Sequence, residues 1–428
     1  MAFESSDLGL AANEDELVVN INLSRATDKD ASIALKLEAT GVSIGSEFST
    51  EPAAHDNTIS LSVLKGEKHT SFKVIKSNGV LFDGDEFITV SISSAGESLV
   101  LGEKSVLKLT FSEILAAQAT LELSGGGTNY PNKVFVDLSA NRQQAVERAS
   151  WDLGFYMKDD FKVILNSSTG MMARALDKND LNTVTPQDTS GFATAMVFAN
   201  AAALPWIDDP SGDLSKTAIG SVAVTASENK VYIINRGSGA GTPAPKRGWK
   251  KIRVIRSASG GYTLQHADIN ATTFQQIEIG KEDKALFQYI HFENGAVNVE
   301  PNKDKWDIAW TYFTNTANFG PSVVPYGFQD IVLLNRHSVQ VAKVLASSVS
   351  YADFKESDLS ALTFNSSQIA IGADWRRTLP APAIAYEDRF YVVKDADGNY
   401  YKLRFLSLTT DGQRGRPRIE FALVKKGI

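Results

Sequence analysis

Few side chains in this sequence could supply a nitrogen or sulfur ligand to a metal ion. The chain has 428 residues, with no cysteine, five histidines and five methionines. Without thiols, the sequence excludes disulfides, zinc ribbons, iron–sulfur clusters and cysteine nucleophiles together. A metal centre that needs nitrogen or sulfur ligands would therefore depend on a small set of histidines and methionines, with tyrosine oxygen as a further ligand.

Two histidines are the leading candidates for a nitrogen ligand. His337 follows Asn335 and Arg336 in a predicted turn between two strand-like runs, where its ring could face a groove. The alternative for His337 is a turn histidine that bonds to the backbone. His291 alternates with Tyr289 on the face of a predicted strand opposite the apolar residues, and that face is either solvent or the wall of a cleft.

The other histidine of this region and the methionines have simpler structural explanations than metal binding. His266 lies in a predicted strand and is expected on the surface of a sheet. Methionine is commonly a flexible packing residue, so one member of the Met171–Met172 pair is expected to fill a core. The candidate methionines are Met157, Met171, Met172 and Met196.

The sequence contains no familiar catalytic motif. It lacks a Gly-x-Ser-x-Gly elbow, an HExxH helix and a phosphate loop, and its glycine-rich run 237–243 leads into prolines rather than into a helix. A carbohydrate-active enzyme would use paired carboxylates from distant parts of the chain, which leave no spacing pattern. We therefore expect a protein that is not an enzyme, with glycan cleavage as an alternative to test.

The charge of the chain argues against nucleic acid as a partner. The formal net charge is −7, whereas nucleic-acid binders need a clustered excess of Lys and Arg. Residues 246–256 are strongly basic, but from Lys251 onward their charges alternate with Ile252 and Val254. This alternation predicts an edge strand protected against pairing.

Periodicity indicates an all-β chain that begins with a sandwich. Apolar and polar residues alternate in short runs separated by Gly, Asn and Asp clusters, as in an antiparallel β-sandwich. Residues 1–114 are predicted to form this domain, and a flexible connector follows near Ser124–Thr128. The predicted strands are Leu17–Leu23, Ser32–Leu37, Ile59–Val63, Ser71–Ile75, Phe87–Ile92 and Ser105–Phe111.

Several steps in this sandwich resemble a Calx-beta domain. They are Gly45–Thr50, a Gly-Glu step at residues 66–67 before a strand, and Gly84–Glu86 before another strand. Some members of that family bind calcium, which takes six or more oxygen ligands. The resemblance allows such a role for Asp83, Asp85, Glu86 and Glu113. The simpler expectation is a solvated turn with a glycine at positive φ.

The rest of the chain contains a long internal repeat. Ser150–Phe155 (SWDLGF) recurs as Lys305–Trp310 (KWDIAW), and the segments that begin at Asn166 and Asn335 match over the same length. Units of this size are tandem domains or halves of one large domain, rather than solenoid repeats. We predict two related antiparallel β modules, at residues 115–276 and 277–428.

The second module resembles the HmuY family. The matching segments are Lys305–Trp310, Asp388–Lys394, Tyr400–Leu406 and Arg414–Phe421. Through the internal repeat, the resemblance extends over about residues 117–428. Members are secreted or lipid-anchored all-β proteins of Bacteroidetes, and the best-known members capture haem at the cell surface. The resemblance therefore implies a non-enzymatic binding protein at the cell surface, the outer membrane or outside the cell.

The resemblance also implies a ligand and partners. The implied ligand is haem or another small flat molecule, with His337 as first axial candidate, His291 as second, and Arg336 available to a propionate. Host haemoproteins or an outer-membrane transporter are the implied partners. The implied precursor carries a signal that ends in a lipidated cysteine, so that membrane attachment depends on a lipid anchor absent from this chain.

An adhesive scaffold without haem is the competing expectation. In that case the modules would attach to glycan or protein, and exposed aromatic rings in a shallow groove would stack on sugars. The candidates for such stacking are Trp206, Trp249 and Trp375.

Overall fold

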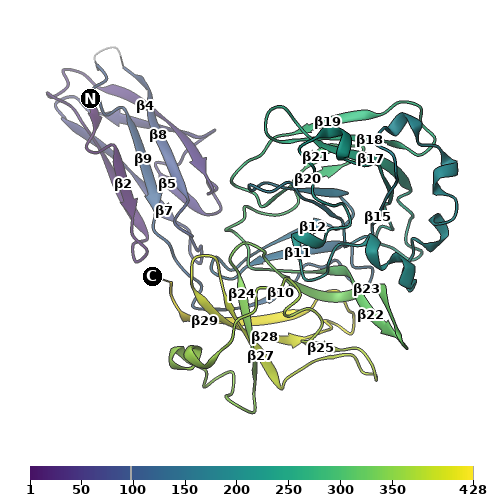
Figure 1. Cartoon of the computed structure of the whole chain (residues 1–428). Coiled ribbons are helices and arrows are strands. Elements are labelled where there is room, and N and C mark those ends of the chain that lie inside the picture. The colour runs from purple at the N-terminus through teal and green to yellow at the C-terminus, as the bar shows by residue number, and fades with distance from the viewer. Residues whose placement is uncertain (97–98, 428) are drawn as a thin grey trace. The chain divides into compact units, whose positions relative to one another are not determined.

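The computed structural model describes residues 1–96 and 99–427, and it divides into two compact units between residues 116 and 117 (Figure 1). Nearly all regular structure is β, and most sheets are antiparallel. The prediction of an all-β fold is confirmed. Helices in the described part of the chain are short 3-10 turns, and none is long and apolar enough to cross a membrane.

The first unit is a sandwich of two sheets. Its strands are β1 (Ala2–Phe3), β2 (Asp7–Leu10), β3 (Glu16–Asn22), β4 (Ala31–Thr40), β5 (Phe48–Glu51), β6 (Thr58–Val63), β7 (His69–Lys76), β8 (Phe87–Ala95) and β9 (Val106–Phe111). One sheet has the order β1-β3-β7-β5, and the other has the order β2-β9-β8-β4-β6. Residues from both sheets form one apolar core, and all six strands predicted in this region are observed.

The acidic turn before β8 is closed by one of its own carboxylates. Glu86 is buried and accepts hydrogen bonds from the backbone N–H groups of Asp83 and Gly84. Gly84 has a φ of +89°, as expected from the sequence. Burial, followed by the effect of Asp83, raises the pKa of Glu86 to about 7. The turn is therefore organised around a buried acid rather than being fully solvated.

The second unit contains four main sheets that correspond in pairs. Its strands are β10 (Gln118–Glu122), β11 (Asn132–Asp137), β12 (Arg142–Glu147), β13 (Leu153–Tyr156), β14 (Val163–Leu165), β15 (Met172–Ala175), β16 (Tyr232–Asn235), β17 (Trp249–Arg256), β18 (Tyr262–Asp268), β19 (Gln275–Ile279), β20 (Phe287–His291), β21 (Gly295–Val297), β22 (Ile308–Phe319), β23 (Ser322–Leu334), β24 (Gln340–Leu345), β25 (Arg376–Arg377), β26 (Ile384–Ala385), β27 (Arg389–Lys394), β28 (Tyr400–Ser407) and β29 (Arg418–Lys425). The 3-10 helices are η1 (Leu181–Thr183), η2 (Pro186–Thr189), η3 (Ala193–Ala195), η4 (Ala201–Trp206), η5 (Leu214–Lys216), η6 (Ala226–Glu228) and η7 (Glu356–Ala361).

The sheet orders display the internal repeat. The sheet β15-β16-β17-β18-β19 corresponds to β24-β27-β28-β29-β10, and the sheet β14-β13-β20-β21 corresponds to β23-β22-β11-β12. Strand β17 lies in the middle of its sheet, so the prediction of an edge strand in the basic run is wrong. Within β17, Lys251 is 1% exposed and donates to the backbone carbonyls of Val184 and Ala271.

The two sequence repeats exchange their first strands. Strand β11 precedes the first Trp-Asp pair, residues 151–152, but hydrogen-bonds with β22, which follows the second Trp-Asp pair, residues 306–307. Strand β20 precedes the second step but pairs with β13, which follows the first. In the same way, β10 of the first repeat pairs with β29 of the second, and β19 of the second repeat pairs with β18 of the first. One half therefore consists of the segment from β13 to β21, and the other combines β10–β12 with β22–β29. The predicted boundary between residues 276 and 277 falls inside β19 and does not separate these halves.

The repeated aspartates fasten the exchanged strands. Asp152 accepts a hydrogen bond of 2.9 Å from the backbone N–H of Phe292, just after β20. Asp307 accepts one of 2.8 Å from Leu138, just after β11. Each aspartate thus holds a strand supplied by the other repeat, which explains why both copies contain this residue type.

The repeated asparagines close a loop in each half. The side-chain amide of Asn166 donates to the backbone carbonyls of Arg148 and Trp151. The amide of Asn335 donates in the same way to Lys303 and Trp306. The tryptophans themselves lie in an apolar cluster that joins the two central sheets, where Trp151 packs edge-on against Tyr289 and Trp306 against Phe135.

Candidate ligand-binding site

The second unit has a cavity large enough for an organic ligand. Its volume is about 640 Å³, within the range of about 300–1,000 Å³ that is typical of small-molecule sites. Because the loop 237–248 forms one wall, we call it the glycine-loop cavity. The lining includes Tyr130, Arg148, Met172, Met196, Phe198, Lys246, Trp249 and Tyr312. Among the residues that the structure describes, the lining of this cavity contains two cationic side chains, Arg148 and Lys246, and no carboxylate.

The glycine loop is held tightly against the segment after β14. The backbone N–H of Ser238 donates to the carbonyl of Thr169 at 2.9 Å. Gly237 has a φ of +70°, and a Cβ added there would lie 1.9 Å from the same carbonyl oxygen. Only glycine fits this close approach, so the sequence of the loop fixes the position of the cavity wall.

Arg148 joins three parts of that wall. Its guanidinium donates to the carbonyls of Tyr130 at 2.7 Å and Gly239 at 3.0 Å, and also to that of Ser168. It lies 4.7 Å from the centre of the Tyr312 ring. Because these bonds use the guanidinium structurally, the exposed side chain of Lys246 is the cation better placed to meet a ligand.

The candidate methionines are packing residues. None of the four is more than 3% exposed, so even Met172 and Met196, which contribute to the lining, present very little surface to a ligand. Met172 and Met196 belong to an apolar cluster that borders the cavity. Met157 and Met171 lie in the core between two sheets of one half. The expectation that one of the Met171–Met172 pair fills a core therefore holds for both residues.

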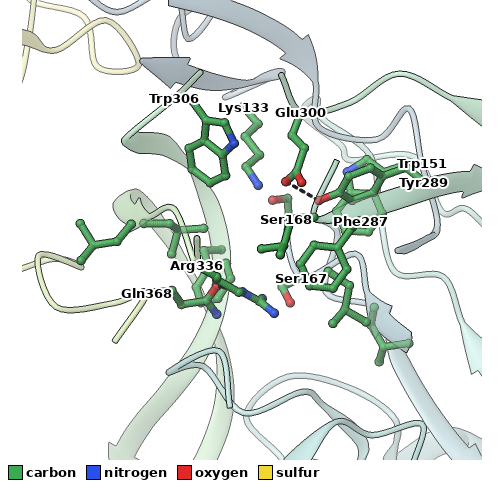
Figure 2. Close-up of a pocket in the computed structure, with 16 residues that line it drawn as sticks. Lys133, Trp151, Ser167, Ser168, Phe287, Tyr289, Glu300, Trp306, Arg336 and Gln368 are labelled. Carbon is green, nitrogen blue, oxygen red and sulfur yellow. Dashed lines mark hydrogen bonds between the residues drawn. The ribbon is translucent and has the colours of Figure 1, made fainter. Parts of the chain in front are cut away.

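A second, smaller cavity lies where the two halves meet (Figure 2). We call it the tryptophan-pair cavity because Trp151 and Trp306 both line it. Its volume is about 40 Å³, room for about three water molecules, which excludes a porphyrin. Charged and polar side chains also line it: Lys133, Ser167, Ser168, Tyr289, Glu300, Arg336 and Gln368.

Burial changes the acid–base properties of the tryptophan-pair cavity. Desolvation lowers the pKa of Lys133 to about 8 and raises the pKa of Glu300. The Tyr289 hydroxyl donates to Glu300 at 2.7 Å, and Arg336 donates from Nε to Gln368 at 2.8 Å. Both strands that supply Lys133 and Tyr289, β11 and β20, are exchanged between the halves.

His337 and Arg336 are neighbours in sequence but have different surroundings. His337 lies in a turn, where its backbone N–H donates to the side-chain oxygen of Asn335 at 2.9 Å. Its Nε2 atom lies 3.0 Å from a carboxylate oxygen of Asp304. The guanidinium of Arg336 instead lies in the tryptophan-pair cavity, 5.2 Å from the ring centre of Phe287. Neither residue lines the glycine-loop cavity. The structure therefore does not bring this pair together around one large cavity.

His291 lies beside a network of ion pairs. Its Nδ1 atom is 3.4 Å from Glu293, and Asp152 offers an oxygen nearby. Such a group resembles a metal site in composition. However, Asp152 and Glu293 are both paired with Arg236, at 2.9 and 2.7 Å, and Arg247 lies 3.0 Å from Asp152. The acids are already compensated by cations, so the group stabilises the fold and does not suit a metal ion.

His266 is buried, contrary to the expectation from sequence. It is 2% exposed and lies 5.3 Å from the ring of Phe292. Its Nε2 atom has no hydrogen-bond partner, and burial, followed by the effect of Lys250, lowers its pKa. The histidine is therefore held in its neutral form and lies within the interior.

Of the three candidate tryptophans, Trp249 borders the glycine-loop cavity, whereas Trp206 and Trp375 line none of the cavities described above. Trp375 is 1% exposed and donates to the carbonyl of Asp330, and Trp206 is half-buried against Phe192. Trp249 lines the glycine-loop cavity and also a shallow hollow of about 520 Å³. That hollow contains Asp268 and Asn270, whose polar groups suit a hydroxylated ligand.

The fold and its cavity define a class: an all-β binding protein built from two strand-exchanged halves. The model of the HmuY family, described as HmuY protein, matches residues 129–421. Because this match covers more than half of the sequence, the chain belongs to the HmuY family. A search of curated proteins finds no match.

Three of the matching solved structures illustrate a distant similarity. The apo-form Calx CBD1 domain is 17% identical over 26% of this chain and 97% of its own, with a TM-score of 0.22. The CBD12 structure from CALX1.2 is 12% identical in sequence, and the match covers 34% of this chain and 74% of that structure, with a TM-score of 0.23. A proposed carbohydrate-binding protein from Bacteroides ovatus ATCC 8483 is 11% identical in sequence, and the match covers 78% of this chain and 97% of that structure, with a TM-score of 0.19. With TM-scores this low, none of them bears on the ligand.

Several residues of the two cavities were not found from sequence. Tyr312 and Lys246 line the larger cavity, and Lys133 and Glu300 line the smaller one. For Lys133 a signal existed, since a lysine directly before the apolar run 134–136 is unusual on a buried strand. Glu300 follows an exchanged strand, and its partners could not be known without the pairing of the halves.

Proposed function

We propose that this chain is a non-enzymatic surface binding protein that captures a flat anionic molecule, with haem as the first candidate. The observation that supports it most is the glycine-loop cavity, which is of ligand size, carries aromatic rings and has cations but no carboxylate in its described lining. Apolar walls with a few polar groups are typical of cofactor sites. Membership of the HmuY family supports a surface binding protein.

The lining of the cavity fits haem in size and charge. Phe198 and Trp249 offer aromatic surface to a flat ligand, Tyr312 adds a ring edge and a hydroxyl, and Lys246 offers a cation to a propionate. Tyr312 is the residue in this cavity that we assign as iron ligand, because the methionine sulfurs are buried and Tyr130 is 3% exposed and bonded to Asp330. Haem would supply the iron and the flat apolar surface for this recognition.

Haem titration of the purified protein tests the proposal. The wild-type protein is expected to give a shifted Soret band that Tyr312→Phe abolishes and Lys246→Met weakens about tenfold. The matched controls are His337→Ala and His291→Ala, which should leave the band unchanged. Loss of the band in either histidine variant, with retention in Tyr312→Phe, would assign haem to the histidines predicted from sequence. No band in the wild type would end the haem proposal.

A glycan-binding role is the second candidate, and the position of Trp249 favours it. This ring borders the shallow hollow that holds Asp268 and Asn270, an arrangement suited to stacking on a sugar. Binding to a glycan array that is lost in Trp249→Ala but kept in Tyr312→Phe would support this role over haem capture. Turnover of any bound glycan would instead show an enzyme.

The proposal extends to location and partners. A lipid-anchored form at the outer membrane would bring the cavity to haemoproteins of a host and to a transporter that accepts the ligand. Fractionation of cells that express the natural gene, with detection of the protein at the surface, checks the location.

A further inference from the structure

The tryptophan-pair cavity gathers hydrogen-bond donors that lack acceptors. Trp151 and Trp306 are equivalent residues of the two repeats, are 4% and 6% exposed, and have no hydrogen-bond partner for either indole nitrogen. Buried donors are nearly always paired, because an unpaired one costs about 1–3 kcal/mol. Both tryptophans line the cavity, so an acceptor bound there, with a small adjustment of the indoles, would relieve this cost.

Two cations line the same cavity. Figure 2 shows the ammonium of Lys133 and the guanidinium of Arg336 pointing into the space between Trp306 and Phe287. The repeat makes this charge asymmetric, since the position of Lys133 is occupied by Phe287 in the other half and that of Arg336 by Ser167. The cations are therefore particular to one half and are not required by the shared fold.

Nearby carboxylates only partly offset these cations. One oxygen of Glu300 accepts the Tyr289 hydroxyl, and the other has no hydrogen-bond partner. Asp208, which faces Arg336, accepts from the backbone N–H groups of Leu165 and Ala218. Glu300 is the one acidic residue in the described lining, against two cations.

We propose that the tryptophan-pair cavity binds a small monovalent anion between Lys133, Arg336 and the two indole N–H groups. The volume of about 40 Å³ limits the anion to the size of chloride, formate or acetate. Such an anion would accept from both indoles and would separate the two cations. This site is distinct from the glycine-loop cavity and does not depend on the function proposed for that cavity.

The six tryptophans of the chain make the site observable. In an ¹⁵N-labelled sample, each indole N–H gives one NMR peak, which is assigned by single Trp→Phe substitutions. Sodium formate, acetate and chloride are titrated at constant ionic strength, with sodium gluconate as an anion too large to enter. We expect saturable shifts of the Trp151 and Trp306 peaks with the small anions alone, while the peaks of Trp206 and Trp375 stay in place.

Two substitutions should change affinity in opposite directions. Lys133→Met removes a cation and is expected to weaken binding at least tenfold, whereas Glu300→Gln removes the opposing charge, keeps an acceptor for Tyr289 and is expected to tighten binding severalfold. A merely structural role would not produce this opposite pair. Lys65→Met, at an exposed lysine of the first unit, is the matched control and should have no effect.

The wild-type titration decides the proposal even where a variant does not fold. Absence of saturation up to 100 mM of each small anion would overturn it and would leave water as the occupant. Equal shifts with gluconate, or saturable shifts that are identical in wild type, Lys133→Met and Glu300→Gln, would overturn it as well. Selective shifts with the opposite charge effects would establish the site.

Discussion

Asp152 and Asp307 occupy equivalent positions in the two repeats, yet their electrostatic surroundings are opposite. Asp152 is paired with Arg236, the residue that follows β16. The equivalent residue after β27 is Asp395, whose negative charge lies near Asp307. Burial, followed by the charges of Asp137 and Asp395, raises the pKa of Asp307 well above its usual value. The two residues hold the same kind of strand end, but Asp152 lies beside two arginines and Asp307 beside two aspartates.

Replacement of the paired aspartate should be strongly destabilising. Asp152→Asn keeps an acceptor for the N–H of Phe292 but removes the charge that compensates Arg236 and Arg247. We expect the free energy of unfolding to fall by about 3 kcal/mol, as for other broken buried ion pairs. Urea denaturation at pH 7 measures this change. A loss below about 1 kcal/mol would show that Glu293 alone is sufficient to compensate the arginines.

Replacement of the unpaired aspartate should have the opposite effect, and it should depend on pH. A carboxyl with a raised pKa keeps its proton in the folded state while the unfolded chain releases it, so stability falls as the pH rises from about 4 toward the raised pKa. Asp307→Asn has no proton to release. It should therefore be more stable than wild type at pH 7 and match it near pH 4. Denaturation curves across this range check the prediction, and destabilisation at every pH would contradict it.

At the scale of single residues, the sequence located polar positions better than it located their surroundings. The Trp-Asp and Asn positions of the repeat were recognised. The aspartates explain themselves by bonding to strand ends that the other repeat supplies, and the asparagines by closing a loop within each half. Burial of His266 was missed because alternation assigns faces within one strand but does not show which face another sheet covers. The site of Arg336 was missed because that cavity requires strands from both halves.

Among the elements, the glycine loop offers a matched pair of substitutions. Gly237 and Gly248 both have positive φ, but only Gly237 lies against another backbone group, the carbonyl of Thr169. Gly248→Ala should cost about 1 kcal/mol, the usual penalty for an alanine in this conformation. Gly237→Ala should cost about 3 kcal/mol or more and should also weaken ligand capture, since it displaces the cavity wall. Thermal unfolding and haem titration of both variants measure the difference, and equal effects would refute the close approach.

Strand existence was easier to predict than strand neighbours. All six strands predicted for the first unit are present, since each has one buried face and one exposed face. For β17 the alternation of charged and apolar residues was also real, but it suggested an edge when the strand has neighbours on both sides. Lysine and arginine reach past a sheet to bond with distant carbonyls, as Lys251 does, so charge on a strand does not by itself indicate an edge.

For the whole molecule, strand exchange predicts which fragments fold. A fragment of residues 117–428 retains every sheet of the second unit and should show cooperative unfolding close to that of the full chain. Fragments 117–276 and 277–428 each separate exchanged strands from their partners and should aggregate or remain unfolded. Circular dichroism and size-exclusion chromatography distinguish these results. Independent folding of both short fragments would contradict the exchange.

The repeat was visible in the sequence, but the exchange was not. Two copies of one pattern are compatible with strands that pair within each copy or across copies, because the same side chains meet in either arrangement. Phe135 on Trp306 and Tyr289 on Trp151 illustrate this equivalence. Only the three-dimensional structure distinguishes two independent modules from two interlocked halves.

The strand exchange also has a consequence for biosynthesis. Strands β10–β12 leave the ribosome about 160 residues before β22 and still longer before β29, with which β10 pairs. At about 5–20 residues per second, their hydrogen-bonding edges wait roughly ten to thirty seconds for the first partner. In contrast, the segment from β13 to β21 can assemble as soon as it emerges. This order of synthesis allows completion of the second half only once β29 has emerged from the ribosome, and it makes the early strands the part of the nascent chain that most needs protection from aggregation.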